Sequence, residues 1–118
     1  MKDSILDSIK QYVGIDKSID DFDEDILMNI NVVFSVLYQV GVDALKGVTI
    51  EGSDEKWSDV FSESPDLINM CKSYTQLKVR ITFDPPTNSF VMDSLKKTAD
   101  ELEWRIRLQA EGGFEEDE

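Results

Sequence analysis

Apolar residues recur at helical spacing in four long stretches of the chain, two of them in its first half. The first runs from Ile5 to Val13, with Asp3 as its expected N-terminal cap and Gly14 as its end. The second runs from about Asp23 to Gly41, and the acids in its first turn suit the positive end of a helix dipole. Apolar residues lie on several sides of this helix, among them Val32, Phe34, Val36 and Tyr38. We therefore expect other parts of the protein to pack against it on several sides.

The second half of the chain predicts two further helices joined by a stiff corner. Ser64-Pro65-Asp66 is a strong helix start, with a capping hydroxyl and a proline at the first helical position. Phe83-Asp84-Pro85-Pro86 stops this helix, because neither proline can donate a backbone hydrogen bond. Asn88 or Ser89 then caps a last helix that continues to about Ile106. The two prolines are expected to set these helices antiparallel.

The region between the two helix pairs is irregular. Residues 47–52 form a short β-prone run between glycines, an expected edge strand or hairpin arm. Trp57 and Phe61 lie at helical spacing, which is consistent with one or two helical turns. The predicted fold is therefore mainly α, a small bundle of about four helices with a short β-prone loop or hairpin in the middle. It forms a single domain over residues 1–110, followed by a flexible acidic tail at 111–118.

Charge narrows the possible functions. The 118 residues contain 25 acids and 12 bases, which gives a net charge of −13 and argues against a protein that grips phosphates or anionic membranes. The balance is −10 over residues 1–66, +2 over 67–110 and −5 over 111–118. Faces of opposite sign favour head-to-tail contact between copies, which closes into a ring where the rotation allows.

Candidate chemistry is sparse, so we expect no enzyme and no cofactor. The chain has no histidine and one cysteine, Cys71, which falls on an apolar helix stripe and reads as a buried small hydrophobe. Residues 20–25 are rich in acids, but a calcium loop starting at Asp21 would need glycine at Ile26 and glutamate at Val32. Asp93-Ser94-Leu95 matches the phosphopantetheine tripeptide of acyl carrier proteins, yet it lies inside a predicted helix with only 24 residues after it.

No membrane segment is expected. The chain is uncharged from Ile26 to Val42, but these 17 residues fall short of the ~20 that a spanning helix needs and contain several polar side chains. The first seven residues carry acids where a signal peptide needs an apolar stretch. We therefore expect a soluble protein made in the cytoplasm.

Some side chains are candidates for contact with a partner. The aromatic residues that flank loops either fill a partner's pocket or close the domain's own core, and the sequence leaves both open. The candidate interface set joins them to the proline corner and to nearby arginines: Trp57, Phe61, Arg80, Phe83, Asp84, Pro85, Pro86, Phe90, Arg105 and Arg107.

Residues 74–86, YTQLKVRITFDPP, resemble the "YLKVRLLFDPP" segment of small head–tail connector proteins of long-tailed bacteriophages. Residues 89–93 and 101–106 are similar to the final helix of the same proteins, and residues 5–15 and 25–31 to their opening. The likeness covers most of residues 5–110 and rests on many ordinary residues in order, not on a catalytic signature.

The resemblance implies a structural virion protein. Members are helical and form a ring, typically dodecameric, under the portal of the capsid, where they extend the DNA channel. The implied partners are other copies of the chain, the portal protein and the next head-closure or tail-completion protein. DNA only passes through the lumen, where acidic side chains would let it slide. The implied location is the neck of the virion.

Two alternatives come from other classes of protein. An acidic DNA mimic, which inhibits a DNA-processing protein, would explain the net charge without a ring. It predicts acids spread over one continuous elongated face, and Arg80, Arg105 and Arg107 fit it poorly. The sequence is also compatible with an acidic adaptor of the host.

Overall fold

The computed structural model describes residues 4–111, and over that range the chain contains five α-helices and no β-strand. The predicted mainly helical fold is confirmed. The expected acidic tail, apart from Glu111, lies outside the described residues, as does Asp3. The helices are α1 (Ile5–Tyr12), α2 (Asp23–Gln39), α3 (Trp57–Val60), α4 (Ile68–Phe83) and α5 (Ser89–Ala110).

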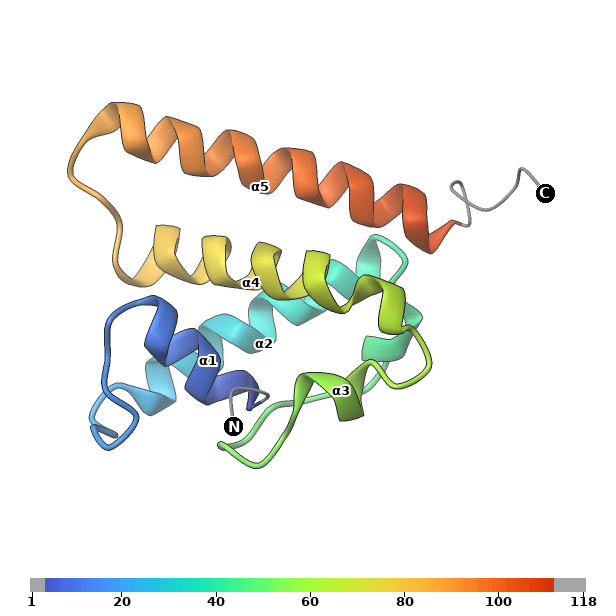
Figure 1. The fold of residues 1–118 in the computed structure, drawn as a ribbon, viewed down its shortest axis with the longest axis horizontal. Helices are drawn as coiled ribbons and strands as arrows, with labels where there is room; N and C mark the ends of the chain where they lie inside the picture. Colours follow the sequence, from blue (N-terminus) through green and yellow to red (C-terminus); the bar gives the residue numbers. More distant parts are fainter. Residues whose placement is uncertain (1–3, 112–118) are drawn as a thin grey trace.

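Helix α4 lies at the centre of the arrangement. Helices α1 and α2 pack on one side of it, and α5 packs on the other as the return arm of an antiparallel hairpin (Figure 1). The acid-rich loops at residues 15–22 and 51–56 lie on the side of the molecule remote from α5 (Figure 1). These two acidic loops are therefore separated in space from α5, whereas Asp43, Glu63 and Asp66 lie beside its C-terminal end.

The ends of the helices follow from local chemistry. Ser4, and not Asp3, caps α1, because its Oγ accepts a hydrogen bond from the Asp7 amide at 3.2 Å. Asn88 caps α5 as predicted, with Oδ1 3.1 Å from the Val91 amide nitrogen. Gly41 follows the end of α2 with φ +118°, and a Cβ there would lie 3.1 Å from the Cβ of Ala110. A larger residue at Gly41 would strain the backbone and crowd the end of α5.

The start of α4 differs in detail from the prediction. Pro65–Leu67 forms a single 3₁₀ turn, and the α-helix begins only at Ile68. The Leu67 amide bonds to the Ser64 carbonyl at 3.0 Å, which is the three-residue spacing of a 3₁₀ turn. The hydroxyl of Ser64 makes no capping hydrogen bond, so the local signal for this turn is the fixed backbone angle φ of Pro65.

An aromatic cluster joins α2 to α3. Trp57 stacks on Phe61 with ring centroids 6.2 Å apart, and Phe34 meets both rings edge-on. The indole Nε1 of Trp57 donates to the Ser8 hydroxyl at 2.8 Å, which ties α1 to the same cluster. The Ser8 hydroxyl in turn donates to the Ile5 carbonyl, so the polar atoms in this part of the core are paired.

The β-prone segment at 47–52 forms no strand, which corrects that expectation. Its backbone is instead hydrogen-bonded to a side chain of α2. Asn31 Nδ2 donates to the Ile50 carbonyl at 3.0 Å, and Asn31 Oδ1 accepts from the Ile50 amide at 2.8 Å. The amide group of Asn31 therefore stands in for the edge of a neighbouring strand. The segment is a loop fixed to α2, with Ile50 in the core.

Replacing Phe61 by alanine should destabilise the fold by ~3–5 kcal/mol, because the change leaves a cavity beside Trp57 and Phe34. Urea unfolding followed by tryptophan fluorescence measures the loss. The neighbouring exposed Ser62→Ala variant should stay within about 0.5 kcal/mol of the parent. Equal stabilities of the two variants would contradict the assignment of Phe61 to the core.

Candidate interaction surfaces

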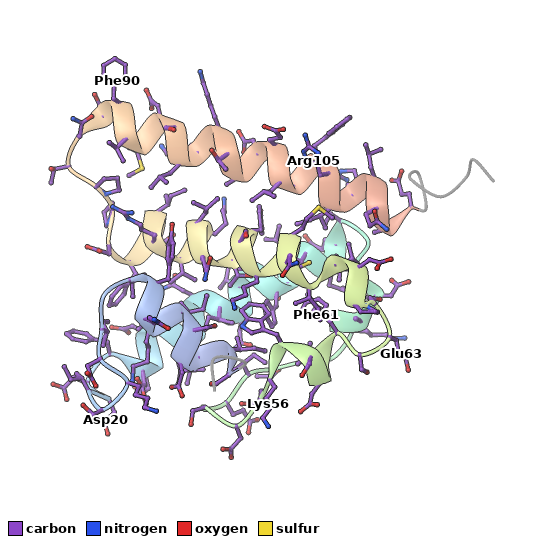
Figure 2. All side chains as sticks on the ribbon, viewed as in Figure 1. Asp20, Lys56, Phe61, Glu63, Phe90 and Arg105 are labelled. Atoms are coloured by element: carbon purple, nitrogen blue, oxygen red, sulfur yellow. The ribbon has the colours of Figure 1, made fainter. Side chains whose placement is uncertain are left out.

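The structure separates the four predicted contact aromatics. Trp57 and Phe61 are 1% and 0% exposed, so they close the domain's own core and are not on the surface. Phe83 is half-buried and meets Phe22 edge-on at 5.8 Å. Phe90 is 83% exposed and points away from the helix hairpin (Figure 2). Of the four, only Phe90 offers most of its ring to solvent.

The corner between α4 and α5 is open to solvent. Asp84 and Pro85 are exposed, and Pro86 is half-buried. Arg80 lies in the last turn of α4, half-buried, and its Nε is buried without a hydrogen-bond partner among the described residues. The corner sets the direction of α5, as the prolines predicted, and also presents the exposed start of that helix.

The two arginines of α5 are engaged within their own helix. Arg105 pairs with Glu101 at 2.9 Å and Arg107 with Glu103 at 3.3 Å, each one turn away. Glu103 also accepts a hydrogen bond from the Tyr74 hydroxyl at 3.1 Å, which clasps α5 to α4. Burial, and then the nearby Glu103 carboxylate, raise the pKa of Tyr74, so this hydroxyl stays protonated and donating.

The outer face of α5 is largely uncovered. Only Ala99 and Ile106 of its 22 residues are buried. Phe90, Lys97 and Trp104 recur at seven-residue intervals, a spacing that places them on one side of a helix. The Trp104 side chain is 59% exposed. Sequence reasoning missed Trp104, although the seven-residue spacing from Phe90 could have indicated it.

Helix α2 is covered on several sides, as expected, by α1, by α4 and by the 3₁₀ turn Asp43–Leu45, but one stripe along it is uncovered. Phe34 is buried and Val36 half-buried, but Val32 is 58% exposed and Met28 is 64% exposed. None of the described helices packs against this stripe. The hydrophobic residues of α2 therefore fall into two groups, one in the core of the domain and one on its surface.

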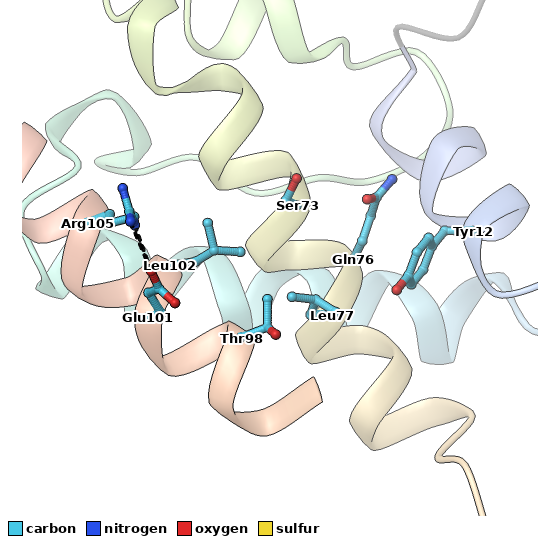
Figure 3. A pocket seen from close by; sticks show the side chains of 8 residues that line it. All are labelled: Tyr12, Ser73, Gln76, Leu77, Thr98, Glu101, Leu102 and Arg105. Carbon is cyan, nitrogen blue, oxygen red and sulfur yellow. Dashed lines mark hydrogen bonds and ion pairs between the residues drawn. The ribbon is translucent and has the colours of Figure 1, made fainter. Parts of the chain in front are cut away.

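A groove of about 460 Å³ runs between the end of α1, α4 and α5 (Figure 3). Tyr12, Leu77 and Leu102 provide apolar lining, and the Arg105–Glu101 pair stands at one rim. Its walls come from three separate stretches of sequence, so no local pattern could reveal it. The rest of the lining is polar and comes from Ser73, Gln76 and Thr98.

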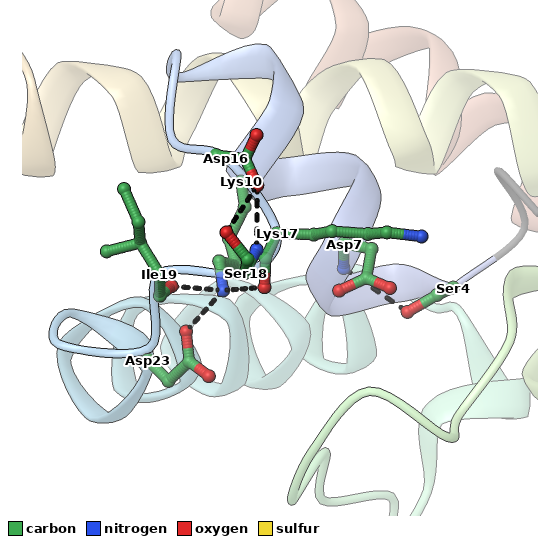
Figure 4. Close-up of polar contacts among 8 residues, drawn as sticks. All are labelled: Ser4, Asp7, Lys10, Asp16, Lys17, Ser18, Ile19 and Asp23. Atoms are coloured by element: carbon green, nitrogen blue, oxygen red, sulfur yellow. Dashed lines mark hydrogen bonds and ion pairs between the residues drawn. The ribbon is translucent and has the colours of Figure 1, made fainter.

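A buried lysine organises the acidic loop before α2 (Figure 4). The Lys10 side chain is almost fully buried, and its Nζ lies 2.8 Å from Asp23 Oδ1. The same ammonium donates to the carbonyls of Ile19 at 2.6 Å and Lys17 at 3.2 Å. The Lys10 ammonium therefore supplies positive charge to the oxygens of this acid-rich segment. Over residues 4–111, no group of three or more acidic, cysteine or histidine side chains could hold a metal ion.

Two titratable groups show the contrast between surface and core. Hydrogen bonds from the Ser18 amide and hydroxyl lower the pKa of Asp16, which caps the turn beside Lys10. Burial raises the pKa of the Cys71 thiol to about 12. Cys71 is free and fully buried, as its place on the apolar stripe predicted, and at neutral pH it is a protonated core residue.

Lys10→Met should destabilise the fold by about 3 kcal/mol, because it leaves the Asp23 carboxylate and two carbonyls without their cation. This loss of stability is at the low end of the range for breaking a buried ion pair, because the Asp23 side chain is 28% exposed. Urea unfolding measures it, with the exposed Lys17→Met variant as the matched control. A Lys10→Met variant as stable as that control would contradict the anchoring role.

Native protein at pH 8 should react with a chromogenic thiol reagent at least ~100-fold more slowly than protein in urea, because only the unfolded thiol, with pKa near 8.5, ionises there. Because the thiol has a higher pKa in the folded state than in the unfolded state, it contributes to stability in full below pH ~8.5. This contribution to the free energy of unfolding decreases as the pH rises from there towards about 12. Labelling of native protein at the unfolded rate would show that Cys71 is accessible.

Comparison with known proteins gives one informative result. A family model described as "Phage connector protein" matches residues 5–113. No curated protein and no solved structure gives a significant match. Across the described part of the chain, no helix is long and apolar enough to cross a membrane.

Proposed function

Because the chain belongs to the phage connector protein family, a family of structural components of the virion, we propose that it is the subunit of a head–tail connector ring. In this proposal, copies assemble side by side beneath the portal. The ring continues the DNA channel and offers its other end to the next head-closure or tail-completion protein. The work of the protein is shape and contact, and no catalytic step is assigned to it.

The observation that supports a ring is the presence of two unlike surfaces on one small domain. The side remote from α5 carries acidic segments, with six acids and one base in residues 15–25 and three acids and one base in residues 51–56. The other side is the α4–α5 hairpin, where residues 68–110 contain seven bases and five acids. Subunits with unlike faces repeat head to tail, which is the arrangement that generates a closed ring.

The net charge of −13 suits a channel that DNA passes through without being held. A surface that grips DNA neutralises phosphates with lysine and arginine and releases counterions. An acidic lumen repels the backbone instead, so the duplex slides. This proposal assigns no individual residue to the lumen.

The alternative, an acidic DNA mimic, has weaker support. It needs carboxylates along one continuous elongated face, whereas α4 carries Lys72, Lys78 and Arg80 and no acid. The exposed Phe90 and Trp104 on α5 also have no counterpart in a phosphate mimic. The division of charge favours contact between copies.

Mixing the purified chain with portal particles of the same phage should give a ring of a single, defined stoichiometry on each portal. Native mass spectrometry counts the subunits, and negative-stain microscopy shows where they lie. The chain without portal is the control, because assembly can require the template. Portal particles that remain bare at saturating protein would overturn the proposal, and so would binding as isolated single copies.

A further inference from the structure

We propose that the acidic tail, residues 111–118, docks into the groove between the end of α1, α4 and α5 of its own chain. Phe114 occupies the apolar part of the groove, and the acids that follow it lie against the basic side chains of α4. The contact belongs to a single copy of the chain, so it goes beyond the proposed ring and is tested without portal.

The groove extends over two adjoining hollows on one side of α4. The first, of about 460 Å³, has its apolar lining from Tyr12, Leu77 and Leu102 (Figure 3). The second, of about 410 Å³, shares Tyr12 and Gln76 with the first and adds Lys72. Together they offer an apolar patch next to a positive charge. This combination fits a short peptide in which an aromatic residue is followed by acids.

The charged groups that line the two hollows favour an acidic occupant. Lys72 forms no ion pair within the described chain, and the other two charged lining residues, Glu101 and Arg105, are paired with each other. Helix α4 contains no acid. Asp7 on α1 and Asp100 on α5 line neither hollow. The lining therefore keeps one uncompensated positive charge.

Arg80 adds a second basic group on the same side of α4. It follows Ser73 by seven residues and Gln76 by four, and these spacings place the three residues along one side of the helix. The Arg80 side chain forms no ion pair in the described part of the protein, and its Nε has no hydrogen-bond partner there. A carboxylate is the acceptor that a guanidinium binds most strongly.

The acids beside the end of α5 direct the tail away from the hollow nearest to it. Gln109 and Ala110, which precede the tail, line that hollow together with Asp43, Glu63 and Asp66. The tail itself contains five acids and no base, so these carboxylates repel it. The basic side of α4 attracts it instead.

The tail is long enough to reach the groove of its own chain. The hydrogen bond from Tyr74 to Glu103 shows that these two residues lie at the same level of the antiparallel hairpin. Ala110 comes seven residues after Glu103, which corresponds to ~10 Å along the axis of α5. Phe114 comes four residues later, and an extended chain of this length spans ~13 Å. The two glycines between them allow the chain to reverse its direction.

A spin label on the tail tests the contact in the whole chain. A nitroxide maleimide is attached to ¹⁵N-enriched Asp117→Cys protein, in which the buried Cys71 stays unlabelled. The label should broaden the backbone amide signals of Ser73 and Gln76 in nuclear magnetic resonance spectra and leave the signal of Val32 on α2 unchanged. Salt at ~0.5 M should weaken the broadening, because it shortens the screening length to about 4 Å.

Two substitutions in the labelled chain separate the apolar anchor from the charge. Phe114→Ala removes the anchor and should reduce the docked population ~10-fold. Ser73→Glu places a carboxylate in the groove at an exposed position and should also weaken the broadening. The matched control Ser35→Glu makes the same change at an exposed position on α2 and should leave the broadening as it is. Circular dichroism checks that each variant is folded.

A mixture shows which copy the tail occupies. Spin-labelled protein without ¹⁵N is mixed with unlabelled ¹⁵N-enriched protein, and docking within one chain predicts no broadening in the enriched copy. Broadening there assigns the tail to the groove of a second copy and overturns the contact within one chain. Groove signals that stay sharp in the labelled chain, or signals broadened equally on α2 and α4, overturn docking in the groove altogether. These measurements use no portal, so the proposed ring stands or falls separately.

Discussion

The packing of one helix between two others governs the rest of this molecule. Helix α4 touches both α2 and α5, so the core is built around it, and Tyr74 clasps it to α5 through Glu103. A domain of this size has too few helices to cover the far sides of α2 and α5 as well. The apolar residues left on those sides are therefore a direct consequence of the architecture.

The buried ammonium of Lys10 offsets the repulsion between acidic side chains in the loop before α2. The loop before α2 concentrates acids, and like charges repel when they are brought together. Lys10 reaches from α1 into this loop, forms an ion pair with Asp23 and donates hydrogen bonds to two carbonyls, which fixes the path of the loop. The acidic side of the molecule can thus keep a defined shape.

Local sequence signals predicted the helices well and the surfaces poorly. The Pro85-Pro86 corner, the Asn88 cap and the Gly41 turn depend on neighbouring residues only, so the sequence could show them. The β-prone run at 47–52 became a loop because Asn31, far away in sequence, supplies its partner. Trp57 and Phe61 could belong to a core or an interface until the fold showed which helices meet. The exposure of Val32 and Trp104, and the groove beside Tyr12, likewise depend on packing between distant segments.

The central claim is that this protein functions by side-to-side contact between copies in a ring beneath the portal. A cryo-electron microscopy map of the neck of the virion tests it most directly. The account predicts a closed ring of this protein below the portal. A neck without such a ring would contradict it.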